Sequence, residues 1–197
     1  MRAASAGQIF LIRHGTTAWS AAGRHTSRTD LPLLPEGMAQ ASSAGALLGG
    51  RSFALVLCSP MQRAIATADL AGYGDVIKVT EDLREWDYGD LEGKTSSEIC
   101  GTYPGWTIWT GPVPNGETLA EVGKRADRVL GRVSRAGGDA ALFGHGHMLR
   151  VLTARYLDLD PVEGRRFALD TATLNILGRE HDYTTVRVWN QSAHGVR

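Results

Sequence analysis

Two histidines of the chain follow short apolar segments in the same way. A single residue separates His14 from the apolar residues 9–12, and a single residue separates His145 from the apolar residues 141–143. Because the carboxyl ends of parallel strands meet at one edge of a sheet, where open α/β proteins bind ligands, we expect the two imidazoles to lie close together. Arg63 follows a third apolar segment, and its side chain should point back over the same edge, since helical side chains lean toward the N-terminus.

Such a set of side chains is suited to phosphoryl transfer without a metal ion. A neutral imidazole can attack phosphorus and hold the phosphoryl group, and the guanidinium groups of Arg13 and Arg63 offer fixed donors to the oxygens of the transition state. A carboxylic acid must then protonate the leaving oxygen. Glu85 is the candidate, because a carboxyl group partly buried among neighbours such as Leu83 and Trp86 keeps its proton more readily.

Apolar runs of strand length alternate with longer segments of helical period. This alternation predicts the α/β class, with a mostly parallel central sheet in a three-layer α/β/α arrangement. The predicted strands are residues 8–13, 53–57, 76–79 and 140–143, followed by a closing hairpin-like pair at 173–177 and 185–189. The predicted helices are residues 35–48, a helix that begins at Ser59, residues 118–135 and residues 147–157.

Two of these helices carry local signals in their sequence. At the first, Ser59 is predicted as the N-cap, Pro60 as the first helical residue, and Gln62 as the partner in a capping box. On the helix over residues 118–135, Glu121 and Arg125 are predicted to form an exposed ion pair, because residues four apart lie on one helical face.

The 197 residues are predicted to form one domain, residues 1–197, with an active-site insert at about 81–116. The insert shows little regular pattern, and long irregular segments of this kind are usually functional. Trp86, Trp106 and Trp109 lie in it. The sequence supports two roles for them equally, plain packing and the wall of a substrate pocket.

Charge and composition exclude several other classes of protein. Lysine and arginine together number 21, as do aspartate and glutamate, so the formal net charge is zero. No global basic field is present to attract nucleic acid or an anionic membrane. No apolar segment approaches the ~20 residues that span a bilayer, no signal peptide is apparent, and Cys58 and Cys100 are too few for a disulfide framework. We expect a cytoplasmic protein whose partner is a small phosphorylated substrate; the oligomeric state is left open.

Taken together and in order, the motifs resemble the histidine phosphatase superfamily, also called phosphoglycerate mutase-like. The motifs that carry the resemblance are Arg13-His14-Gly15-Thr16 with Trp19, residues 23–33, Ser59-Pro60 with Arg63 and Thr67-Ala68, residues 83–93, Gly116-Glu117-Thr118, and His145-Gly146. By position, the resemblance implies the catalytic roles. His14 is the phosphorylated nucleophile and Glu85 the proton donor, and the phosphate pocket consists of Arg13, Arg63 and His145.

Within the superfamily, the chain looks most like the sedoheptulose-bisphosphatase-like and acid phosphatase members. The resemblance implies Ser20, Thr26, Ser27 and Gly146 as substrate-binding residues. Ser20 stands where many members have asparagine, and Ser27 stands where the mutases have glycine. Both hydroxyls could donate to a phosphate, but the two departures speak against a mutase.

The predicted function is a metal-independent phosphomonoesterase for small phosphorylated metabolites, sugar phosphates among them, that works through a phosphohistidine and needs no cofactor. One alternative is a phosphoglycerate mutase, in which a lid excludes water so that the phosphoryl group returns to the substrate. A second is a non-catalytic module that binds phosphorylated ligands, which has no use for a proton donor such as Glu85. His145 and His147 are two residues apart, but no further Cys/His cluster accompanies them, so no metal site is predicted and the role of His147 stays open.

Overall fold

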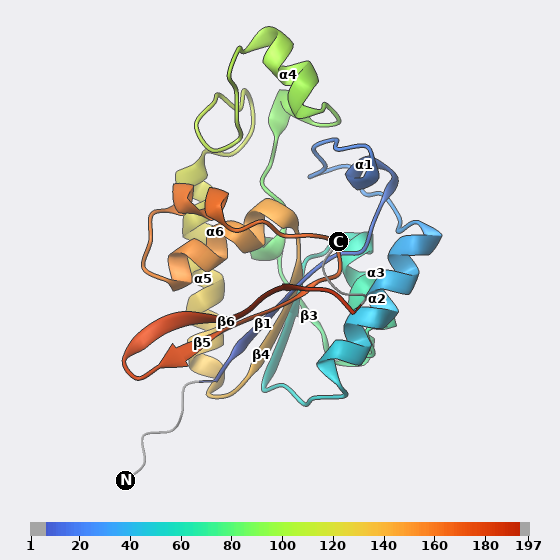
Figure 1. The fold of residues 1–197 in the computed structure, drawn as a ribbon, viewed down its shortest axis with the longest axis vertical. Coiled ribbons are helices and arrows are strands. Elements are labelled where there is room, and N and C mark those ends of the chain that lie inside the picture. The colour runs from blue at the N-terminus through green and yellow to red at the C-terminus, as the bar shows by residue number, and fades with distance from the viewer. Residues whose placement is uncertain (1–6, 194–197) are drawn as a thin grey trace.

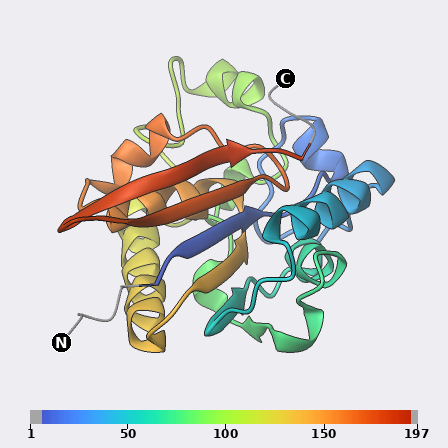
Figure 2. The same ribbon diagram turned by 60° about the horizontal axis from the view of Figure 1, so that its bottom comes forward.

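The computed structural model describes residues 7–193. A six-stranded sheet lies at the centre of the fold (Figure 1). The strands are β1 (Ile9–Arg13), β2 (Leu55–Cys58), β3 (Lys78–Val79), β4 (Ala140–Gly144), β5 (Leu174–Glu180) and β6 (Tyr183–Gln191). Their order in the sheet is β3-β2-β4-β1-β5-β6, and the first four are parallel. β5 runs antiparallel to β1. β6 runs antiparallel to β5, and these two strands form the predicted closing hairpin (Figure 2).

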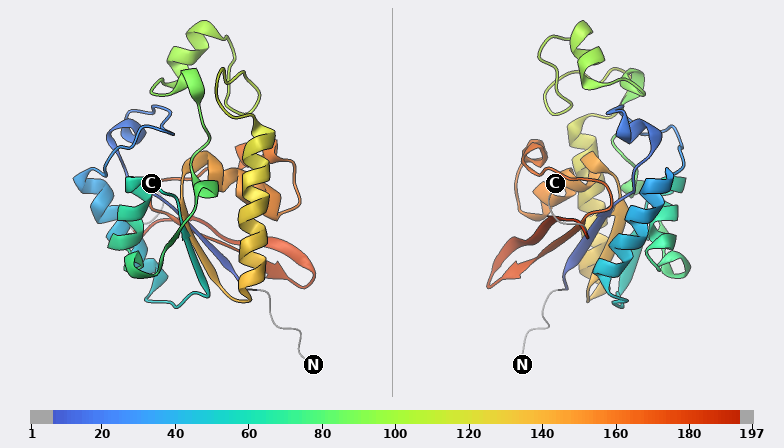
Figure 3. Two further views of the ribbon diagram at one scale, coloured as in Figure 1. Left: turned by 180° about the vertical axis from the view of Figure 1, so that it is seen from behind. Right: turned by 45° about the vertical axis from the view of Figure 1, so that its right-hand side comes forward.

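Helices cover both faces of this sheet. They are α1 (Ala18–Ala21), α2 (Pro35–Leu48), α3 (Gln62–Leu70), α4 (Ser96–Thr102), α5 (Leu119–Ala136) and α6 (Gly146–Tyr156). Figure 3 shows α2 and α3 on one face and α5 and α6 on the other. The predicted α/β class with a mostly parallel sheet between two helical layers is therefore confirmed.

Strand β1 shows why its apolar run is continuous rather than alternating. Successive side chains of a strand point to opposite faces of the sheet. Phe10 and Ile12 pack into the cluster that includes α2 and α3, whereas Ile9 and Leu11 pack into the cluster that includes α5 and α6. All four side chains are buried, so the strand contributes to two hydrophobic cores at once and holds the layers together.

The start of α3 differs from the prediction. The helix begins at Gln62 with Met61 at the N-cap, whose side chain makes no capping bond; Oδ1 of Asp30 accepts instead from the backbone N–H of Gln62 at 2.9 Å. The hydroxyl oxygen of Ser59 lies instead 2.7 Å from Nε2 of His145, and the Gln62 side chain donates to the carbonyl oxygen of Asp30 at 2.6 Å. The predicted capping box was wrong because partners distant in sequence take up both polar side chains.

The predicted ion pair on α5 was also wrong. Glu121 is used at the start of the helix, where it forms a capping box with Thr118. Arg125 is nearly buried, and its Nη2 donates to Oε2 of Glu117 at 2.7 Å. The same guanidinium group donates to the carbonyl oxygens of Arg84 at 2.8 Å and Glu85 at 3.3 Å. Arg125 thus ties the segment that carries Glu85 to α5.

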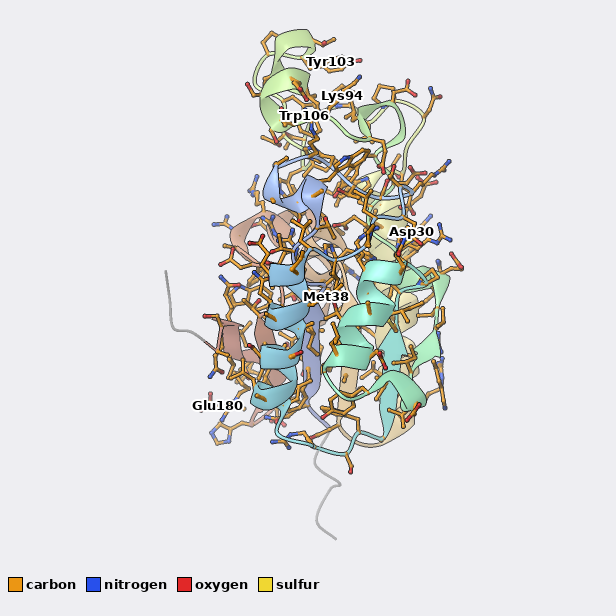
Figure 4. All side chains as sticks on the ribbon, turned by 90° about the vertical axis from the view of Figure 1, so that its right-hand side faces the viewer. Asp30, Met38, Lys94, Tyr103, Trp106 and Glu180 are labelled. Carbon is orange, nitrogen blue, oxygen red and sulfur yellow. The ribbon has the colours of Figure 1, made fainter. Side chains whose placement is uncertain are left out.

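The insert, residues 81–116, forms a lobe beyond the carboxyl ends of the parallel strands (Figure 1). It is less irregular than predicted, because it contains α4, whose capping box joins Thr95 and Glu98. Figure 4 shows Trp106 in this lobe, at the opposite end of the molecule from Glu180 in the closing hairpin. The insert is therefore positioned to build one wall of a site at the strand ends.

Candidate active site

The register between β1 and β4 brings the two predicted histidines together. Arg13 pairs with Gly144 in the parallel ladder, and the backbone N–H of His14 donates to the carbonyl oxygen of Gly144 at 3.0 Å. The next residues along each strand are His14 and His145, and the centroids of their rings are 5.1 Å apart. The sheet itself therefore places both imidazoles at its carboxyl edge.

The hydrogen bonding of His14 identifies its reactive nitrogen. Nδ1 lies 2.8 Å from the carbonyl oxygen of Gly15, which can only accept, so Nδ1 carries the proton and Nε2 has the free electron pair. Burial, and next the guanidinium groups of Arg13 and Arg63, hold the pKa of His14 well below its usual range. No residue among 7–193 forms a hydrogen bond with Nε2. His14 is thus a neutral imidazole with a nucleophilic nitrogen available.

Three buried nitrogen atoms close to His14 have no hydrogen-bond partner within the described chain: Nε of Arg13, Nε of Arg63 and Nδ1 of His145. Buried polar groups are nearly always paired, and an unpaired donor costs about 1–3 kcal/mol. Burial and the nearby arginines hold the pKa of His145 well below its usual range, so the ring is neutral. Since the Ser59 hydroxyl can donate to Nε2 of His145, Nδ1 can be the N–H group. Three donors of this kind match the oxygens of a phosphoryl group.

The loop over residues 26–29 holds Arg63, whose side chain is fully buried. Nη1 of Arg63 donates to the carbonyl oxygen of Thr29 at 3.0 Å, and Nη2 donates to that of Ser27 at 3.1 Å. Glu92 fixes this loop, because its carboxylate accepts bonds from the backbone N–H groups of Ser27 and Thr29 and from the Ser27 hydroxyl at 2.5 Å. Ser27 is therefore buried and engaged with Glu92, and the structure does not bring its side chain to the wall of the pocket. The sequence did not single out Glu92.

Glu85 joins the insert to the start of α6. Its Oε1 accepts bonds from the backbone N–H groups of Trp86 at 2.9 Å and Met148 at 2.8 Å, and its Oε2 accepts one from His147 at 3.0 Å. The side chain is 7% exposed and lines the pocket. The bond from His147 leaves Oε2 a further electron pair on which a proton can be carried.

A pocket of about 460 Å³ opens above these groups. Of the predicted substrate-binding residues, Ser20, Thr26 and Gly146 line it. The Ser20 hydroxyl also accepts a bond from the backbone N–H of Thr17 at the start of α1, and the Thr26 hydroxyl donates to the carbonyl oxygen of Arg24. We call the part of the site formed by Arg13, His14, Arg63, Glu85 and His145 the inner end.

Two glycines allow close packing at the inner end. A Cβ atom on Gly15 would lie 2.3 Å from the carbonyl oxygen of Gly37, so the loop after β1 can approach the start of α2 only without a side chain. A Cβ atom on Gly146 would lie 3.4 Å from the guanidinium group of Arg13 and 3.6 Å from Oε2 of Glu85. The Gly146 backbone thus leaves room for a ligand between the two charged groups.

Aromatic and imidazole rings, with one guanidinium group, form a further part of the pocket lining. We call this part the outer wall; it consists of His25, Trp106, Trp109, His147 and Arg150. Trp106 and Trp109 thus line the pocket. Trp86 is buried instead, and its Nε1 donates to the carbonyl oxygen of Glu117 at 2.8 Å, so this ring packs in the core.

Sequence reasoning missed two members of the outer wall, His25 and Arg150. The Arg150 guanidinium lies 4.7 Å from the centre of the Trp109 ring. A signal for it was present, because Arg150 follows His147 by three residues on a predicted helix and therefore shares its face. No comparable signal indicates that His25 would face His147.

Residues 7–193 contain no helix long and apolar enough to cross a membrane. Within the same part of the chain, no three side chains of histidine, cysteine, aspartate or glutamate gather as a metal ion requires. At the inner end, the positive charge comes from Arg13 and Arg63, which are held by carbonyl oxygens.

Comparison with known proteins agrees with this geometry. The family model of the histidine phosphatase superfamily (branch 1) matches residues 9–192. An acid phosphatase of Mycobacterium tuberculosis is 41% identical over 191 residues, which are 95% of this chain and 94% of that protein. A sedoheptulose 1,7-bisphosphatase of Saccharomyces cerevisiae is 33% identical over 184 residues, with coverage of 77% and 68%.

Among solved structures, that of an open reading frame product of Mycobacterium tuberculosis superimposes with a TM-score of 0.89 at 40% identity, covering 95% of this chain and 99% of the other. The chain belongs to the histidine phosphatase superfamily. The resemblance seen in the sequence motifs is thereby confirmed.

Proposed function

We propose that this chain is a metal-independent phosphomonoesterase that hydrolyses small phosphorylated metabolites, sugar phosphates among them, through a phosphohistidine on His14. One observation carries the proposal: a neutral His14 lies among three buried donors, and neither its Nε2 nor these donors have a hydrogen-bond partner among residues 7–193. An acceptor with several oxygens is the ligand that satisfies such donors, and an attacking nitrogen among them suits phosphorus chemistry.

In the first step, Nε2 of His14 attacks phosphorus and the bond between phosphorus and the ester oxygen breaks. Arg13, Arg63 and His145 donate hydrogen bonds to the non-bridging oxygens, whose charge they stabilise in the transition state. Glu85 gives its proton to the departing alkoxide, so that a neutral alcohol leaves.

In the second step, a water molecule replaces the alcohol. The Glu85 carboxylate takes a proton from this water as its oxygen attacks phosphorus, and the bond between phosphorus and Nε2 breaks. Inorganic phosphate leaves, His14 regains its neutral form, and Glu85 is again protonated. The proton that Glu85 lost in the first step is thus restored in the second.

The identity to an acid phosphatase favours hydrolysis over phosphoryl return to the substrate, and the name of the yeast relative supports sugar phosphates as a substrate class. The outer wall supports the same class, because aromatic rings pack against the apolar faces of polyhydroxylated ligands. The mutase alternative requires that water be kept from the phosphoenzyme.

A panel of phosphate esters, assayed for phosphate release in the presence of EDTA, tests the proposal. A mutase assay primed with bisphosphoglycerate should run beside it. We expect release of inorganic phosphate from sugar phosphates with no effect of chelation. Activity that disappears with EDTA and returns with a divalent ion contradicts the metal-independent mechanism, and phosphoryl transfer between hydroxyls without phosphate release identifies a mutase.

A further inference from the structure

The ring of His147 lies against a buried phenol. The Tyr88 hydroxyl oxygen lies 2.6 Å from Nδ1 of His147. Tyr88 is 2% exposed, and burial, followed by the nearby Glu85 carboxylate, raises the pKa of its phenol well above the usual value. The phenol therefore keeps its proton and can donate it to Nδ1. Burial, together with Arg150 and His25, holds the pKa of His147 well below its usual range, so the ring carries one proton, which lies on Nε2 when Nδ1 accepts from Tyr88.

His147 is also held in place on several sides. Its backbone N–H donates to Oε2 of Glu85 at 3.0 Å. Its ring lies parallel to the ring of His25, at 5° and 6.1 Å between centroids, and meets the ring of Trp109 at 5.4 Å. The residue lines the pocket, and within residues 7–193 no group forms a hydrogen bond with Nε2. The result is a rigid, neutral imidazole on the same residue whose backbone N–H donates to Glu85.

We propose that Nε2 of His147 donates a hydrogen bond to an oxygen of the leaving alcohol, and that Tyr88 is a positioning residue that fixes the required tautomer. The inference rests on the proposed function, since it concerns the alcohol that Glu85 protonates. Because the backbone N–H of His147 donates to Oε2 of Glu85, the proton donor, the oxygen that Nε2 meets should lie close to the ester oxygen. The favoured ligands are phosphate esters with a hydroxyl group one or two carbon atoms from the ester oxygen.

Discrimination follows from the cost of an unpaired donor. If a hydrocarbon covered Nε2 of His147, its N–H group would lose water without gaining an acceptor. A site that donates to a substrate hydroxyl therefore rejects the analogue that lacks it more strongly than an apolar pocket rejects an added group. The Tyr88–His147 pair would thus select polyhydroxylated alcohols over simple alkyl ones.

Glycerol 3-phosphate and propyl phosphate are matched probes, because they differ only in the hydroxyl groups of the alcohol. The quantity to measure is the ratio of kcat/KM for glycerol 3-phosphate to that for propyl phosphate. We expect this ratio to fall about tenfold in His147→Leu and about threefold in Tyr88→Phe, where the tautomer is no longer fixed, with the change mainly in KM. Intrinsic differences between the esters cancel when each variant is compared with the wild type.

Two further variants serve as controls. In His147→Gln, the side-chain amide places an N–H group near the position of Nε2, so the ratio should recover in part. Tyr73→Phe removes the hydroxyl of a different buried tyrosine, whose hydrogen bond goes to the carbonyl oxygen of Arg51 and which does not line the pocket. Its ratio should equal that of the wild type.

Long-range ¹H–¹⁵N NMR spectra of the wild-type protein report the tautomer without any assay of activity, and the His147→Gln spectrum assigns the signal. A proton on Nε2 of His147 that moves in part to Nδ1 in Tyr88→Phe supports the inference. A wild-type proton on Nδ1, or an unchanged substrate ratio in His147→Leu, overturns it. If the wild-type protein releases phosphate from no ester at all, the proposed function has failed instead, so the two failures are distinguishable.

Discussion

At its inner end the pocket is built largely at strand ends, with Arg63 from α3 and Glu85 from the start of the insert, whereas its outer wall is built from loops, the rest of the insert and the first turns of α6. His14 and His145 each follow a strand directly, and the ladder between β1 and β4 fixes their separation. Trp106 and Trp109 belong to the insert, and His25 belongs to a loop after α1.

The comparison indicates a division of labour. A parallel sheet buried on both faces is a rigid frame, so groups at its edge keep the geometry that phosphoryl transfer needs. Loops tolerate changes in length and sequence, and substrate selection can vary in them without moving the reacting groups. Substitutions at the inner end should therefore lower kcat, and substitutions in the outer wall should alter KM and substrate preference.

The largest effect is expected for His14→Ala. Since this imidazole is the only group proposed to form the covalent bond, kcat should fall on the order of 10⁴- to 10⁶-fold, with no phosphoenzyme trapped after rapid quenching. Far-UV circular dichroism should match the wild type, because the ladder bond at this position comes from the backbone. A phosphoenzyme that still forms in His14→Ala would show that another residue is the nucleophile, and the role given to the inner end would then be wrong.

The next effect concerns Glu85→Gln. Loss of general acid catalysis typically costs ~10²- to 10⁴-fold, but only where the leaving oxygen needs a proton. Sugar phosphates should therefore slow far more than p-nitrophenyl phosphate, whose phenolate leaves unprotonated. Equal slowing of both esters would make Glu85 a binding or structural residue of the inner end, in line with its three backbone hydrogen bonds.

Acid should destabilise the fold through three histidines, two at the inner end and one in the outer wall. The pKa values of His14, His145 and His147 are held well below the usual value, chiefly by burial. As the pH falls below ~6.5, the unfolded chain binds a proton at each of these residues and the folded chain does not, so stability present above that pH is lost. Each histidine contributes about 1 kcal/mol between about pH 6.5 and 5.5, and about 1.4 kcal/mol per pH unit below that interval.

Urea unfolding between about pH 6.5 and 5.5 measures this loss. His147→Gln should remove the contribution of this one histidine, about 1 kcal/mol over the interval, which separates the contribution of the outer wall from that of the inner end. A slope that does not change in this variant would mean that His147 takes up a proton in the folded protein. The tautomer argument for His147 would then fail as well.

The smallest effect is expected for Trp109→Leu in the outer wall. The ring contacts His147 and lies under the guanidinium of Arg150, so its loss loosens the wall without touching His14. KM for sugar phosphates should rise roughly three- to tenfold, with kcat within about twofold of the wild type. Steady-state kinetics distinguish the two parameters. A fall in kcat that equals that of an inner-end variant would show that the wall and the reacting groups are coupled.

The sequence predicted the layers well and the polar details of helix starts poorly. The pattern of apolar residues predicted the α/β class and the closing pair β5 and β6. A strand that is buried on both faces of the sheet needs apolar side chains at successive positions, so its sequence is a continuous apolar run. Ser59 has the local features of an N-cap, yet its hydroxyl lies against His145, a residue 86 positions away. The helix α4 was missed although Thr95 and Glu98 form a readable capping box.

For the site, sequence determined which residue types stand at the strand ends, and hence the chemistry of His14, Glu85 and the arginines. A strand end is a local feature, and the edge of a parallel sheet gathers all such ends by a general rule. Tertiary structure alone decided that Ser27 is engaged with Glu92, and that Nδ1 of His147 lies against the Tyr88 hydroxyl. Each contact joins the side chains of two residues about 60 positions apart. Neither periodicity nor a short motif in the sequence predicts which distant side chains will be hydrogen-bonded to each other.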